Sequence, residues 1–158
     1  MKKALAIIMV LAMVLAFAAC GDGGKKEENK AFDAKKVAEA LLGSDEFKGC
    51  ALASGEDIEF RYDITLEDTA EFYYTEVTNG LSANMFIIAV AKEGKASLMY
   101  GEMEKIVKTY ASSWVDSNYA ERQAEAPKVK ARYESEKDGV YICIVSNDND
   151  AMLKLIGK

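Results

Sequence analysis

The residues whose types and spacing could support chemistry are carboxylates in the first half of the chain. They form two clusters, which contain Glu56, Asp57, Glu59, Glu67, Asp68 and Glu71. Paired carboxylates can hydrolyse glycosides, and carboxylate oxygens can bind calcium. In a chain with 26 acidic and 20 basic residues, such clusters are more typical of a solvated acidic surface. A hydrolase or lyase that uses acidic residues between Glu56 and Glu71 is therefore kept as an alternative function.

Other catalytic chemistry is restricted by the absence of histidine from the sequence. Histidine is the commonest general base and the commonest metal ligand. Without a histidine, no Ser-His or Cys-His nucleophile can form. Cys50 and Cys143 are too few to complete a structural zinc site by themselves. The sequence also has no glycine-rich phosphate-binding motif. We therefore expect no cofactor, no metal site and no catalytic residue.

Two further groups of polar or aromatic residues are better explained by structure than by ligand binding. Asn147 to Asp150 resembles a calcium loop but lacks the glycine and the distal glutamate of an EF-hand, so Ser146 to Asp148 are expected to cap a short last helix. The aromatic residues could include a platform for ligand stacking, but their helical or strand spacing favours a core position. They are Tyr73, Tyr74, Tyr110, Trp114, Tyr119, Tyr133 and Tyr141.

The amino terminus has the pattern of a secretory signal peptide. Lys2 and Lys3 precede a stretch without charge, Ala4 to Ala19. This stretch has sixteen residues, whereas a membrane-spanning helix needs about 20. We therefore predict that residues 1–19 are removed as a signal peptide.

The residues before Cys20 make the prediction more specific. Phe17-Ala18-Ala19-Cys20 resembles the lipobox of bacterial lipoproteins, in which the cysteine is diacylated and becomes the new amino terminus. The alternative is an ordinary signal peptide with a cysteine there by chance. Residues 21–30 are rich in glycine and charge, which predicts a flexible tether over residues 20–31. We expect a protein anchored by lipid on Cys20 to the extracytoplasmic face of the cell membrane.

The charge of the mature chain narrows the classes of partner. Removal of Lys2 and Lys3 lowers Lys+Arg from 20 to 18 while Asp+Glu stays at 26, so the net charge becomes −8. Nucleic-acid binding needs a basic surface, which this sequence does not offer. Anionic lipid would repel the acidic surface of the mature chain, so the lipid on Cys20 must supply the membrane contact.

The rest of the chain, residues 32–158, has the length of a single domain. Apolar periodicity predicts a helix over residues 31–42, strands over 73–77 and 85–91, a long helix over 95–117, and a strand over 140–145 that precedes the last helix. Alternation of Ile58, Phe60, Tyr62 and Ile64 with charged residues predicts another strand. Pro127 is expected to introduce a further strand, over residues 128–133. Asn79-Gly80 and Asp138-Gly139 are hairpin signals.

These elements imply an α+β fold, in which a mostly antiparallel sheet of about four strands packs against one long central helix, with shorter helices near both ends. The even number of thiols left after lipidation permits a disulfide between Cys50 and Cys143 in an exported protein. Cys143, however, lies in the apolar run Val140 to Val145, where a free buried cysteine is equally compatible. The sequence leaves both alternatives open.

The chain resembles the bacterial lipoprotein family known as domain of unknown function 4358, over about residues 37–156. The similarity lies in Tyr74 and Val77 and in the segments 82–90 (SANMFIIAV), 119–123 (YAERQ), 127–129 (PKV), 139–142 (GVYI) and 145–148 (VSND). Members of that family usually have acidic residues where this chain has Asn84-Met85. The resemblance implies no activity, cofactor or catalytic residue. It does imply a Gram-positive, anaerobic source, which argues against the disulfide.

The sequence therefore favours a non-enzymatic, membrane-anchored binding module that holds a small ligand or a protein partner. The preference rests on the lipid anchor, the single domain and the missing catalytic groups. The carboxylate-dependent enzyme would need two of its acidic side chains to converge in a cleft.

Overall fold

A computed structural model describes residues 32–77 and 81–158. The predicted signal peptide, Cys20, the tether and the turn at Asn79-Gly80 lie outside these residues. Residues 32–158 form one compact unit. Within the described part of the chain, no helix is both long enough and apolar enough to cross a membrane.

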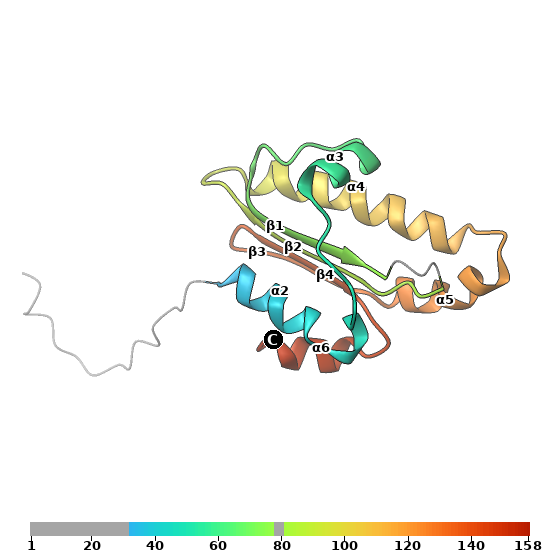
Figure 1. The fold of residues 1–158 in the computed structure, drawn as a ribbon. Coiled ribbons are helices and arrows are strands. Elements are labelled where there is room, and N and C mark those ends of the chain that lie inside the picture. Colours follow the sequence, from blue (N-terminus) through green and yellow to red (C-terminus); the bar gives the residue numbers. More distant parts are fainter. Residues whose placement is uncertain (1–31, 78–80) are drawn as a thin grey trace, which may run out of the picture. The chain divides into compact units, whose positions relative to one another are not determined.

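Over the described residues the fold is α+β, as the sequence predicted, with one four-stranded antiparallel sheet (Figure 1). The strands are β1 (Thr69–Glu76), β2 (Met85–Ala91), β3 (Tyr133–Lys137) and β4 (Val140–Val145), in the order β1-β2-β4-β3. The β3–β4 hairpin turns at Asp138 and Gly139, whose φ angles of 54° and 75° match the turns that favour Asp-Gly.

Helices cover both faces of the sheet, which explains why β2 and β4 are continuous apolar runs (Figure 1). On one face lie α3 (Gly55–Tyr62), the long helix α4 (Ala96–Val115) and α5 (Ala120–Lys130). Because side chains alternate along a strand, Ile87 and Cys143 pack into the core beneath α4.

The other face of the sheet carries a second core. It is covered by α2 (Ala34–Leu42), the short 3-10 helix η1 (Asp45–Phe47) and α6 (Asn149–Leu155), which pack against Phe86, Ile88, Ile142 and Ile144. The Asp148 side chain accepts a hydrogen bond of 2.9 Å from the Ala151 amide at the start of α6. The predicted capping of the last helix is therefore confirmed.

The predicted strand at Ile58 to Ile64 is wrong, because residues 55–62 form helix α3. The Ser54 side chain caps this helix by accepting from the Asp57 amide, at 3.2 Å. One helical turn places Ile58 and Tyr62 on the same side, toward the core, while Phe60 is 92% exposed. The alternation of apolar and charged residues was too short to distinguish a helix from a strand.

The strand predicted at residues 128–133 is also wrong, since α5 continues to Lys130 with Pro127 inside it. Proline removes one helical hydrogen bond, but its fixed φ is compatible with a helix. Val129, on the inner side of α5, is fully buried in the core that α4 also covers, so its packing favours the helix. The following strand begins only at Tyr133.

Cys50 and Cys143 are both free. Cys143 is buried in the core beneath α4, while Cys50 packs against the core on the opposite face of the sheet. The sheet therefore separates the two thiols, and the disulfide that the sequence permitted is not formed. Burial raises the pKa of the Cys143 thiol, which stays protonated at neutral pH.

Candidate functional site

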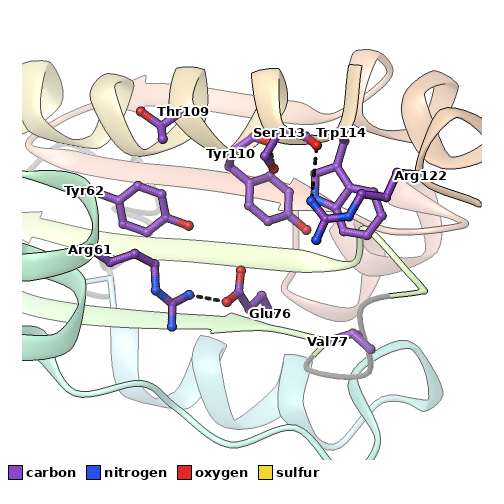
Figure 2. Close-up of a pocket in the computed structure, with 9 residues that line it drawn as sticks. All are labelled: Arg61, Tyr62, Glu76, Val77, Thr109, Tyr110, Ser113, Trp114 and Arg122. Atoms are coloured by element: carbon purple, nitrogen blue, oxygen red, sulfur yellow. Dashed lines mark hydrogen bonds and ion pairs between the residues drawn. The ribbon is translucent and has the colours of Figure 1, made fainter. Parts of the chain in front are cut away.

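A cavity of about 330 Å³ lies where α3, the end of β1, α4 and α5 meet (Figure 2). This volume is at the lower end of the range of about 300–1,000 Å³ found for small-molecule sites. The lining residues are Arg61, Tyr62, Glu76, Val77, Thr109, Tyr110, Ser113, Trp114 and Arg122. They come from four elements, so the cavity exists only in the folded chain.

The elements position these side chains through their packing on the sheet. Ile58 anchors α3 in the core, which places Arg61 and Tyr62 at the cavity. Tyr110 and Trp114 are four residues apart on α4 and therefore share one face of that helix. Both residues are at most 5% exposed, so they belong to the core as well as to the cavity wall.

A chain of polar contacts runs along one side of the cavity. Arg61 forms an ion pair with Glu76, and the Tyr74 hydroxyl donates to Glu76 Oε2 at 2.9 Å. The hydroxyl oxygens of Tyr62 and Tyr74 are 2.8 Å apart. Burial, followed by the nearby charge of Glu76, raises the pKa of Tyr110; burial also raises the pKa values of Tyr62 and Tyr74. All three phenols are therefore neutral at physiological pH.

Arg122 enters the cavity from α5, where Figure 2 shows it beside Trp114. Its guanidinium lies 4.7 Å from the centroid of the Trp114 ring, and Nη1 donates to the Ser113 carbonyl at 3.2 Å. The described residues provide no carboxylate that forms an ion pair with Arg122. In an acidic protein, this guanidinium is a cationic group available to a ligand.

A second cavity, of about 570 Å³, lies between α5 and the turn before α6. Beside it, Lys128 Nζ binds the Glu125 carboxylate and donates to Asn84 Oδ1 at 3.0 Å. Asn84 is 3% exposed and donates to Glu46 Oε2 at 2.6 Å. This network joins η1, the start of β2 and α5, which gives it a structural role.

This network predicts a specific pH dependence of stability. Burial alone would raise the pKa of Glu125, but hydrogen bonds from Lys128 and from the Ala83 amide lower it below the ordinary value. A depressed pKa stabilises the fold above the unfolded-state value of about 4.3, and the contribution is lost as pH falls through the folded-state value. In urea titrations, Glu125→Gln should lose stability less steeply than the wild type as pH falls below about 5.

A matched variant controls for the loss of one negative charge. Glu121→Gln changes an exposed residue of the same helix and should remain closer to the wild-type slope than Glu125→Gln. Identical slopes for Glu125→Gln and the wild type would contradict the role assigned to the Glu125–Lys128 pair.

The acidic residues identified in the sequence do not converge in either cavity. Asp57 hydrogen-bonds Ser54, Glu59 accepts from the Leu66 amide, and Asp68 forms an ion pair with Lys95. Glu56, Glu67 and Glu71 are exposed. Within the described ranges, no group of three or more carboxylate or thiol residues could hold a metal ion. The alternative enzyme therefore gains no support from this region.

Of the seven aromatic residues for which the sequence favoured a core position over a ligand platform, Tyr110 and Trp114 line this cavity. Tyr74 and Tyr141 are fully or almost fully buried in the core, as expected, whereas Tyr119 is 72% exposed. Sequence reasoning missed Arg61, Glu76 and Arg122, which are far apart in the chain. The weak signal available was that only three arginines occur in the sequence, and two of them line this cavity.

The fold and cavity define a class of protein, a three-layer α+β domain with a small polar and aromatic cavity. No family model matches the chain, and comparisons with the curated proteins and with the solved structures give no match either. The resemblance to the lipoprotein family therefore stays a prediction.

Proposed function

We propose that the chain is a lipid-anchored, extracytoplasmic binding module whose cavity at α3, α4 and α5 holds a small molecule. The observation that carries this proposal is Arg122, which lies in the cavity without a carboxylate partner among the described residues and is held in place by Trp114. A preoriented guanidinium loses little conformational entropy when it binds a ligand, which favours recognition.

The membrane location in this proposal rests on the sequence pattern at Cys20 and on the charged segment that follows it. A diacylated cysteine would hold the domain at the membrane surface, and residues 21–31 would leave it free to meet ligands outside the cell. A binding module needs no catalytic group, which agrees with the lack of histidine.

Native mass spectrometry of the protein, released gently from membranes of its source, tests the proposal. We expect a reproducible added mass that disappears in Arg122→Gln. The matched control is Arg132→Gln, which removes the one arginine outside the cavity and should retain the added mass.

Two results would contradict the proposal. A bare polypeptide mass for the wild type would argue against a bound small molecule, and cross-linking to a protein partner would then be the next experiment. An added mass that persists in Arg122→Gln would place any ligand outside this cavity.

A further inference from the structure

The directions of the hydrogen bonds in the cavity determine which groups a ligand would meet. Glu76 is paired with Arg61, so its carboxylate only accepts hydrogen bonds. Tyr74 donates its one hydroxyl proton to Glu76. Tyr62 must therefore donate to Tyr74 across the 2.8 Å contact, and the Tyr62 oxygen can offer only lone pairs to the cavity.

The same reasoning applies to α4. The Tyr110 hydroxyl donates to the Ala83 carbonyl at 2.9 Å, so its oxygen can offer only lone pairs. Ser113 Oγ donates to the Tyr110 carbonyl at 2.7 Å and is likewise left as an acceptor. Figure 2 shows the Tyr62 and Tyr110 rings above the Arg61–Glu76 pair. This part of the cavity therefore adds acceptor oxygens to the Arg61–Glu76 ion pair.

The Glu76 carboxylate and the neighbouring acceptor oxygens would bind a hydrogen-bond donor with positive charge. Glu76 accepts from Arg61 and Tyr74, and a carboxylate has about four lone-pair sites, so two remain. The faces of Tyr62 and Tyr110 add negative quadrupole potential, which attracts ammonium groups. An ammonium carries three donors and no acceptor, which matches this acceptor-rich part.

Arg122 supplies the opposite chemistry. A guanidinium has five N–H donors, and the structure assigns one hydrogen bond of Arg122, to the Ser113 carbonyl. Its planar group suits a bidentate contact with a carboxylate. In Figure 2 Arg122 lies to the right, beside Trp114, whereas the Arg61–Glu76 pair lies below the tyrosines.

We propose that the ligand is a small zwitterion of the amino-acid class, with its carboxylate on Arg122 and its ammonium near Glu76, Tyr62 and Tyr110. This inference rests on the proposed function and specifies its ligand. The volume of about 330 Å³ suits a molecule of this size.

Ligands with a single charge fit the cavity less well. A simple anion would place nothing on the acceptor oxygens and would be repelled by Glu76. A simple cation would leave Arg122 unpaired and would be repelled by it. A ligand with both charges places one charged group on each part of the cavity, its carboxylate on Arg122 and its ammonium near Glu76.

The test is isothermal titration of the purified full chain with free L-amino acids, each compared with its N-acetyl derivative and its carboxamide. The N-acetyl derivative keeps the carboxylate and loses the ammonium, whereas the carboxamide keeps the ammonium and loses the carboxylate. We expect at least one free amino acid to bind about 10-fold or more tightly than both derivatives.

Two variants test which residues bind the carboxylate and the ammonium of the ligand. Arg122→Gln should weaken binding of the free amino acid about 10- to 100-fold. Glu76→Gln should weaken it and reduce the preference over the N-acetyl derivative. Glu136→Gln, at an exposed position of β3, is the matched control and should bind as the wild type does.

Equal binding of an amino acid and its N-acetyl derivative would overturn the inference, as would unchanged affinity in both cavity variants. If no amino acid binds but native mass spectrometry shows an added mass that Arg122→Gln removes, the zwitterion is wrong and the proposed binding function stands. If neither experiment detects a ligand, both are wrong.

Discussion

Replacing Cys20 by serine is expected to abolish incorporation of labelled fatty acid and to prevent lipid anchoring. Serine has no thiol to acylate, so the lipid would be lost completely. One acyl chain gives only marginal membrane binding, and each buried methylene contributes about 0.8 kcal/mol, so the loss of two chains is a very large effect. The measurement is metabolic labelling with a fatty-acid analogue, together with fractionation of membranes and medium.

The control for this variant is Cys50→Ser, which removes a thiol from the folded unit and should retain the label. The Cys20→Ser chain should be found either in the medium or at the membrane with its signal peptide uncleaved, and unlabelled in both cases. Continued lipid labelling of Cys20→Ser would show that the anchor is elsewhere.

Ile58→Ala is expected to destabilise the fold by about 2–5 kcal/mol, whereas Phe60→Ala should change it by no more than about 0.5 kcal/mol. Ile58 is 0% exposed in the core beneath α3 and α4, and its truncation leaves a void. Phe60 is 92% exposed, so its larger side chain contributes little to the packing. Urea denaturation followed by circular dichroism measures both free energies of unfolding.

This pair of variants also distinguishes helix α3 from the strand that the sequence suggested. In a strand, residues 58 and 60 point to the same face, and both truncations would be costly. Similar large losses for the two variants, with unchanged denaturant dependence, would therefore contradict the helix. Unequal losses in the order given would support the placement of Arg61 and Tyr62 at the cavity.

Segments with long or uniform patterns were predicted correctly from the sequence. The run Met85 to Ala91 became β2, and the stripe from Met99 to Trp114 became the buried face of α4. The Asp138-Gly139 turn and the cap at Asp148 were also recognised, because their geometry depends on local residues. The shorter patterns at residues 58–64 and 128–133 were assigned to strands, and packing against α4 decided for helices.

The candidate site could not be predicted in the same way. Arg61, Glu76 and Arg122 belong to three separate segments, and no local pattern relates them. In the sequence, each of the three looks like an ordinary surface charge. The packing of α3 and α5 beside α4 brings the three side chains to one cavity. The acidic clusters were conspicuous in the sequence only because the charges are adjacent, and adjacency does not create a cleft.

The sequence by itself determined the class of fold, the longest helix, the two central strands and the pattern that predicts lipid anchoring at Cys20. These features follow from hydrophobic periodicity, turn chemistry and local motifs, which act over a few neighbouring residues. Only the tertiary structure decided that the sheet separates Cys50 from Cys143 and that two arginines share a cavity with Glu76. Contacts between distant segments depend on how whole elements pack, and local patterns in a single sequence do not specify that packing.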